Sequence, residues 1–103
     1  MPIKAFLAGF FLFNAVPHLV KGITGETHMT PFKKVSSPVL NVIWGFVNLM
    51  VGFFVLGMNP SSGALNVPAG NDFLVFLAGG FVLSIVAAKL FADPKARFPW
   101  HQD

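Results

Sequence analysis

The stretch VSSPVLNVIWGFVNLMVGFFVLGM, residues 35–58, carries no charged side chain and is long enough for one helix to cross a membrane. Ser37 followed by Pro38 is a typical helix start, because serine caps the first turn and proline lacks an N–H where none is needed. Gly57, followed shortly by an Asn-Pro pair, is typical of a helix end. The segment that comes next, NPSSGALNVPAGN, is too polar for a second span. The sequence therefore predicts one membrane-spanning helix at about 38–58.

Two further charge-free stretches lie on either side of this one. Each is slightly short of the roughly 17–25 residues that a span needs, but lysines near the ends extend the usable length by reaching toward the headgroups. We expect these stretches to form helices at about 3–22 and 72–92. Asn71 and Asp72 are suitable side-chain caps for the last helix.

The composition supports the same class of protein. Hydrophobic residues make up 54% of the chain and charged residues 11%, whereas a soluble domain is about 45–50% apolar and about 25% charged. A core of this size could not hide so much apolar surface from water. The absence of cysteine excludes disulfides and thiolate metal sites. The sequence therefore predicts an all-α integral membrane protein, with three transmembrane helices in a single domain over residues 1–103.

Lysine and arginine are distributed unevenly between the two ends of the predicted helices. The N-terminus and the 59–71 loop share one end, where Lys4 is the basic residue. The 22–37 loop and the C-terminal tail share the other end, which holds six: Lys21, Lys33, Lys34, Lys89, Lys95 and Arg97. Because basic residues are retained on the cytoplasmic side, we expect the N-terminus to face out and the C-terminus to face the cytoplasm.

Several polar side chains fall inside the predicted spans, where each needs a hydrogen-bonding partner. They are Asn14, His18, Asn41, Trp44 and Asn48. The first two helices run antiparallel, so at about 1.5 Å per residue His18 and Asn41 lie at one depth, and Asn14 and Asn48 lie deeper. We expect a polar ladder of these two pairs. One interpretation is interhelical adhesion; the other is a small polar cavity with His18 as a titrating group or ligand contact.

Small residues follow helical spacing on two of the helices. Gly45 and Gly52 alternate with the asparagines on one face of the second helix, and Gly80, Ser84 and Ala88 lie four residues apart on the third. Such residues let neighbouring backbones approach closely. We therefore predict these five positions at helix–helix contacts.

Other kinds of site find little support. His18, His28 and His101 share no metal-ligand spacing, so we expect no metal and no cofactor. Catalysis would rest on His18 alone, and no catalytic residue is assigned. The basic residues are too sparse for nucleic-acid binding. The partner that remains is membrane lipid, which the basic residues would contact at the headgroups.

One part of the chain resembles a group of small uncharacterised bacterial inner-membrane proteins. The resemblance rests on FNAVPH at residues 13–18, GITG at 22–25, TPF at 30–32, SSP at 36–38 and NVIWG at 41–45. It implies the bacterial inner (cytoplasmic) membrane and brings no activity with it. A looser likeness to DoxX-like proteins rests on size and apolar helices; those proteins typically have four helices, so no residue role is carried over.

Three functions remain open from the sequence. The first is a structural or accessory subunit that self-assembles as a homo-oligomer or joins a larger membrane complex, because three helices cannot bury all their small-residue faces within one chain. The second is a small oligomeric transporter or channel for an ion or small solute. The third is a quinone- or lipid-binding membrane protein that uses His18 and the asparagines.

Overall fold

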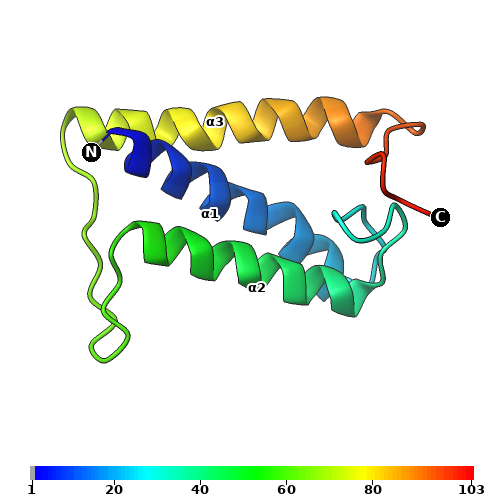
Figure 1. The fold of residues 1–103 in the computed structure, drawn as a ribbon, viewed down its shortest axis with the longest axis horizontal. Coiled ribbons are helices and arrows are strands. Elements are labelled where there is room, and N and C mark those ends of the chain that lie inside the picture. Colours follow the sequence, from blue (N-terminus) through cyan, green and yellow to red (C-terminus); the bar gives the residue numbers. More distant parts are fainter. Residues whose placement is uncertain (1) are drawn as a thin grey trace.

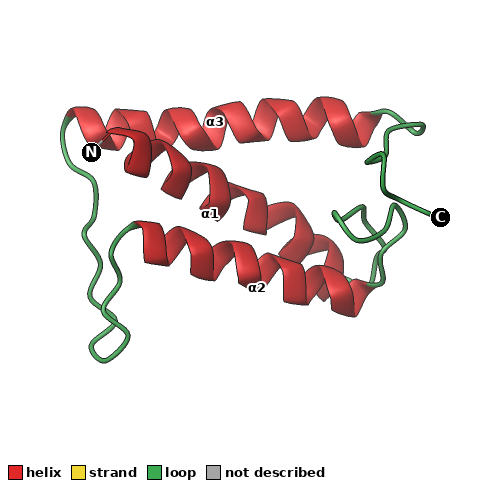
Figure 2. Ribbon diagram, viewed as in Figure 1, coloured by secondary structure: helices red, strands yellow, loops and turns green. Residues whose placement is uncertain are grey.

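The computed structural model describes residues 2–103 and contains three α-helices: α1 (Pro2–Ile23), α2 (Pro38–Val55) and α3 (Asn71–Ala92). The described residues hold no extended strand, and loops join the helices (Figure 2). Each helix is long and apolar enough to cross a membrane. The predicted all-α fold with three membrane-spanning helices is therefore confirmed, while the orientation of the chain in the membrane stays a prediction.

The two ends of α2 have clear local causes. The Ser37 hydroxyl accepts a hydrogen bond from the Leu40 N–H at 3.1 Å, which confirms the predicted cap. The helix ends at Val55 rather than at Met58, because Gly57 adopts a positive φ of 73°. The Gly57 and Met58 N–H groups then bond the Phe54 and Phe53 carbonyls, at 2.9 and 3.1 Å. This pattern closes the last turn of a helix and stops it.

The predicted cap of α3 is wrong. Gly70 occupies the cap position with a φ of 62° and offers no side-chain hydrogen bond, and Asn71 is already the first helical residue. Asp72 lies in the first turn, where its charge is favourable beside the positive end of the helix dipole. The carboxylate thus supports the helix start by charge rather than as a cap.

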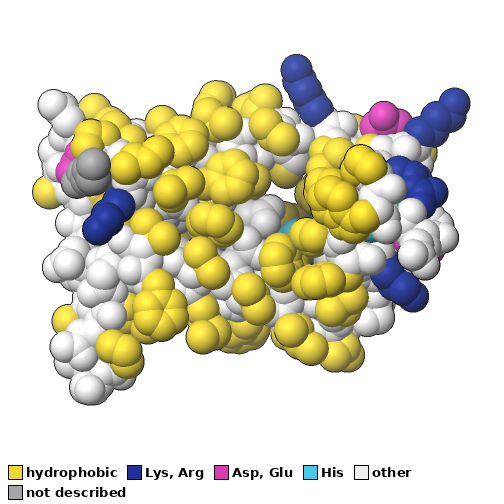
Figure 3. All heavy atoms as spheres, viewed as in Figure 1, with side chains coloured by type: hydrophobic (Ala, Val, Ile, Leu, Met, Phe, Trp, Pro, Cys, Tyr) yellow, Lys and Arg dark blue, Asp and Glu magenta, His cyan; other side chains and the backbone are white. Residues whose placement is uncertain are grey.

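The first helix lies between the other two (Figure 1). It packs along both α2 and α3, whereas α2 and α3 do not contact each other within the described part of the chain. The N-terminus and the 56–70 loop lie at one end of the bundle, and the 24–37 loop and the C-terminal tail lie at the other (Figure 1). In the view of Figure 3, lysine and arginine side chains gather mainly at the second end.

Glycines set the contact between α1 and α2. A Cβ added to Gly45 would lie 2.7 Å from the Leu19 side chain. A Cβ on Gly52 would overlap the Leu12 side chain, and both glycines are buried. The predicted small-residue face of α2 is therefore the face that α1 covers.

The contact between α1 and α3 is closer still. A Cβ on Gly9 would overlap the Phe76 carbonyl oxygen, and a Cβ on Gly79 would overlap that of Phe6. Gly80 faces the Phe13 ring. Here backbone meets backbone, which only glycine permits. The contacts at Gly9 on α1 and at Gly79 on α3 were not predicted, because neither residue belongs to the four-residue series on α3.

Ser84 and Ala88 are not covered by another helix of this chain, so a helix–helix contact at these two positions stays a prediction. Both are exposed within this chain, and the Ser84 hydroxyl donates to the Gly80 carbonyl of its own helix at 2.7 Å. Large apolar side chains also point outward on every helix, for example Val39 at 69% and Phe81 at 67% exposure. Because such a surface is unfavourable in water, it fits the hydrocarbon of a bilayer.

Candidate functional site

The end of the bundle that holds the 24–37 loop is organised by Asn41, which is fully buried. Its Nδ2 group donates to the carbonyls of His28 at 3.0 Å, Ser36 at 3.2 Å and Ser37 at 3.0 Å. Its Oδ1 atom lies 2.8 Å from His18 Nδ1 on α1. One side chain thus joins the first two helices and holds the loop between them.

The second rung lies deeper in the bundle. Asn14 Nδ2 on α1 donates to Asn48 Oδ1 at 3.0 Å, and Asn48 Nδ2 donates to the Trp44 carbonyl at 2.9 Å. Both predicted pairs, His18 with Asn41 and Asn14 with Asn48, are therefore hydrogen-bonded. Their role in ligand binding is a separate question, which depends on the space beside them.

A cavity of about 260 Å³ lies beside the ladder, between α2 and α3. Its floor is α1, through Phe10, Asn14 and His18, and its walls include Trp44 of α2 and Leu83 of α3. It is lined almost wholly by apolar side chains, and none of the described residues around it is charged. In Figure 3, histidine atoms are visible in a recess among apolar side chains on this face. The cavity lies where the backbones of α2 and α3 do not approach each other.

The 24–37 loop forms part of the cavity roof. Met29, Thr30 and Pro31 line the cavity, and the first two are buried. Ser36 Oγ donates its hydrogen to the Lys33 carbonyl at 2.9 Å. In its contact with Thr30 Oγ1, at 2.7 Å, the threonine hydroxyl is therefore the donor. These internal bonds, together with Asn41, give the loop a fixed shape.

The C-terminal tail completes the roof. His101 is buried, and its Nδ1 accepts from the Phe98 N–H at 3.2 Å, so Nε2 carries the proton that is donated to the Thr30 carbonyl at 2.7 Å. The Trp100 indole N–H donates to the Pro31 carbonyl. The Asp103 carboxylate accepts from the Lys34 and Val35 N–H groups at 2.9 and 2.8 Å.

The sequence did not indicate this roof, because each contact between the tail and the loop joins a tail side chain to a backbone group of the loop. Phe98, which lines the cavity, and His101 were therefore missed. The positions of the histidines in the sequence also did not predict that the rings of two of them lie next to each other. The His18 and His28 rings are 5.3 Å apart, and the His28 ring lies 4.0 Å from that of Phe91.

His28 is unusual within the roof. Its Nε2 atom is enclosed and has no hydrogen-bonding partner among the described residues. Burial lowers the pKa of His28 to about 4, with further lowering from charge on His18 and Lys21. The ring is therefore neutral at physiological pH, and it packs as an aromatic side chain against Phe91.

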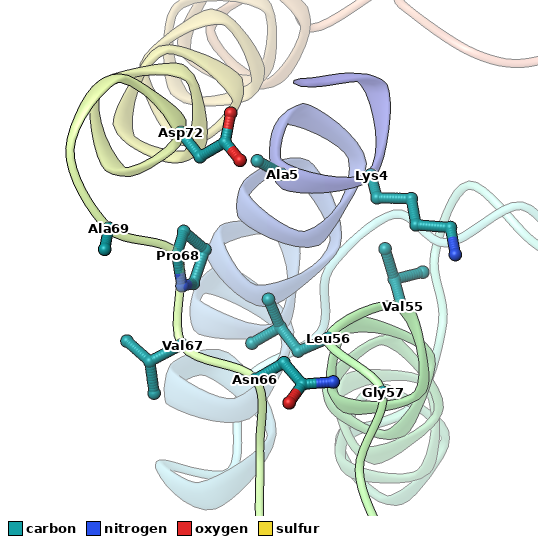
Figure 4. Close-up of a pocket in the computed structure, with 10 residues that line it drawn as sticks. All are labelled: Lys4, Ala5, Val55, Leu56, Gly57, Asn66, Val67, Pro68, Ala69 and Asp72. Atoms are coloured by element: carbon teal, nitrogen blue, oxygen red, sulfur yellow. The ribbon is translucent and has the colours of Figure 1, made fainter. Parts of the chain in front are cut away.

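A second cavity, of about 410 Å³, lies at the opposite end of the bundle (Figure 4). It is bordered by the starts of α1 and α3 and by the 56–70 loop. Its charged residues are Lys4 and Asp72, and the Lys4 side chain extends away from Asp72 (Figure 4). We place the candidate site at the ladder, because there the polar side chains of two helices are hydrogen-bonded to each other.

Neither cavity gathers a set of metal ligands from the described residues. Among residues 2–103, no group of three or more histidine, cysteine, aspartate or glutamate side chains is positioned to hold a metal ion. The comparisons with known proteins add no identity: no family model, curated protein or solved structure matches the chain. The function must therefore be argued from the cavity itself.

Proposed function

We propose that this three-span membrane protein binds a small amphiphilic molecule in the cavity between α2 and α3, with His18 as the polar contact. The observation that carries this proposal is the unsatisfied Nε2 of His18. Its Nδ1 is held by Asn41, while none of the described residues bonds Nε2. A mostly apolar cavity with a few fixed polar groups is the usual form of a small-molecule site.

The bilayer supplies a route to this site. The missing contact between α2 and α3 leaves the cavity open on one side, among side chains that face lipid. An apolar molecule dissolved in the membrane can enter there without crossing water. This is the lipid- or quinone-binding alternative from the sequence, and the shape of the cavity favours it.

The accessory or self-assembling subunit is the second candidate. Ser84 and Ala88 favour it, because they are exposed on α3 beside an apolar groove of about 390 Å³ that Val16 and Pro17 of α1 also line. A second helix would cover such small residues closely. The transporter or channel has no comparable support, since no charged side chain among the described residues lines the ladder cavity.

The test is native mass spectrometry of the protein extracted from its membrane directly into lipid nanodiscs. We expect a bound small molecule that is retained by the parent protein and lost from Ala87→Phe, which fills the cavity from α3. The matched control is Ala92→Phe, an exposed position on the same helix outside the cavity. Equal ligand content in the two variants would contradict the proposal, and a stable oligomer without ligand would favour the second candidate.

A further inference from the structure

The hydrogen bonds around His18 fix which ring nitrogen carries the proton. Asn41 Nδ2 faces three backbone carbonyls, which only accept, so its amide cannot be turned over. Asn41 Oδ1 must therefore be the atom 2.8 Å from His18 Nδ1, and Nδ1 must donate to it. In the neutral imidazole the other nitrogen, Nε2, then bears a lone pair and acts only as an acceptor.

The same reasoning applies one turn earlier on α1. Asn48 Nδ2 is committed to the Trp44 carbonyl at 2.9 Å, so its Oδ1 must accept from Asn14 Nδ2. The Asn14 amide is oriented in turn, and its Oδ1 has no partner among the described residues. Each of the two hydrogen-bonded chains thus ends in one acceptor that has no partner among the described residues: His18 Nε2 in the first and Asn14 Oδ1 in the second.

Both acceptors are accessible. The enclosed side-chain atom without a partner in the described chain is His28 Nε2, so His18 Nε2 and Asn14 Oδ1 must reach open space. The space that both residues line is the cavity between α2 and α3. Residues four apart on a helix are neighbours on one face, with about 5–6 Å between their Cβ atoms. The cavity therefore offers a pair of acceptors one turn apart.

The geometry points to a ligand whose polar head is an uncharged hydrogen-bond donor, a hydroxyl on an apolar ring such as a phenol or a hydroquinone. This inference rests on the proposed function and narrows its ligand. A head that only accepts hydrogen bonds, such as a quinone or an ether, finds no donor at His18 Nε2. A charged head finds no counter-charge among the described residues of the cavity, and burying it there would be costly.

The size of the cavity agrees with a single ring. Its volume is about 260 Å³, and an apolar cavity of about 150 Å³ is enough to bind benzene. A substituted ring therefore fits beside His18 and Trp44, whereas the tail of a longer amphiphile has to leave between α2 and α3. That opening faces lipid, so the tail stays in an apolar medium.

The test uses two probes that share a tail and differ in one hydrogen: para-nonylphenol, which donates, and para-nonylanisole, its methyl ether, which does not. The protein is labelled with ¹⁵N-histidine and placed in nanodiscs, and the His18 resonances are assigned with His28→Gln and His101→Gln. Without probe, we expect His18 to be protonated at Nδ1 and unprotonated at Nε2. The phenol should shift the Nε2 resonance, and the ether should leave it unchanged.

Affinity gives a second readout. One neutral hydrogen bond contributes about 0.5–1.5 kcal/mol, so the phenol should bind roughly two- to tenfold more tightly than the ether. Ala87→Phe should weaken both probes, and Ala92→Phe should weaken neither. Two results would contradict a donor head group but leave the cavity as a binding site. One is a proton on His18 Nε2 in the protein without probe. The other is equal binding of the two probes that Ala87→Phe still blocks. Binding of neither probe would overturn the proposed function as well.

Discussion

Asn41 has more hydrogen bonds than any other side chain of the ladder, and its loss should be the most damaging change there. Asn41→Ala leaves His18 Nδ1 without its acceptor and removes the donor shared by three carbonyls. Because unsatisfied buried groups are costly, we expect the free energy of unfolding to fall by about 2–3 kcal/mol. Reversible unfolding in mild detergent measures this.

Asn66→Ala is the control for that measurement, since Asn66 is exposed in the 56–70 loop. It should change the free energy of unfolding by less than about 0.5 kcal/mol. Similar losses in the two variants would mean that the Asn41 network does not hold the helices together.

The lowered pKa of His28 predicts a loss of stability in mild acid. Its pKa is lowered from 6.5 to about 4, chiefly by burial. The unfolded chain therefore takes up a proton between these values while the folded chain does not, so the free energy of unfolding falls as the pH drops from 6.5 to about 4. His28→Phe should flatten this dependence, and it also removes the unpartnered Nε2. Melting temperatures over this pH range test the prediction; an unchanged slope in the variant would contradict it.

At the scale of the elements, the crossing of α1 and α3 should tolerate no side chain. Gly79→Ala drives a Cβ into the Phe6 backbone carbonyl, which cannot move aside as a side chain can. We expect a loss of about 1–3 kcal/mol. Gly45→Ala should cost less, because its new Cβ meets the flexible Leu19 side chain.

Thermal unfolding of both variants beside Phe81→Leu checks this order. Phe81 is 67% exposed on the same helix as Gly79, and its substitution should be nearly neutral. If Gly45→Ala proved the more damaging of the two glycine variants, the close approach of α1 and α3 would be refuted.

The tail and the loop are joined by a carboxylate whose titration can be followed. The Val35 and Lys34 N–H groups lower the pKa of Asp103 from 3.8 to about 2. The contact is therefore fully present above pH 3.8 and is lost as the pH falls through about 2. The amide resonances of these two residues should titrate near the lower value, and Asp103→Asn should abolish that titration. A midpoint near 3.8 would show that the tail is detached.

For the whole molecule, the uneven distribution of lysine and arginine predicts that the N-terminus faces out and the C-terminus faces the cytoplasm. Cysteines placed at Ser62 and Gln102 lie at opposite ends of the bundle. In intact cells an impermeant thiol reagent should label the first and spare the second. Labelling of Gln102→Cys alone would reverse the orientation, and labelling of both would contradict three spans.

Much of the fold could be predicted, because charge-free runs and depth in a membrane are properties of local sequence. Those properties placed three helices and paired His18 with Asn41. The site was less accessible to sequence reasoning. Its roof depends on His101, Trp100 and Asp103 reaching backbone groups of the 24–37 loop. Every residue carries backbone hydrogen-bonding groups, so a pattern of side chains does not predict which backbone groups the tail will bond. The close approach of Gly9 and Gly79 was missed for a similar reason, since each glycine meets a carbonyl on the other helix.

The central position of α1 also has a consequence for how the chain is made. Of the three helices, α1 is synthesised first and contacts both others. The next helix, α2, already finds on α1 the partners of Asn41 and Asn48 in the ladder, which are His18 and Asn14. The hairpin of α1 and α2 can therefore assemble in the membrane before α3 has left the ribosome. Because α3 makes no contact with α2 in the described part of the chain, it can pack last, against the assembled hairpin. Its arrival, with the tail behind it, turns an open groove on that hairpin into a roofed chamber.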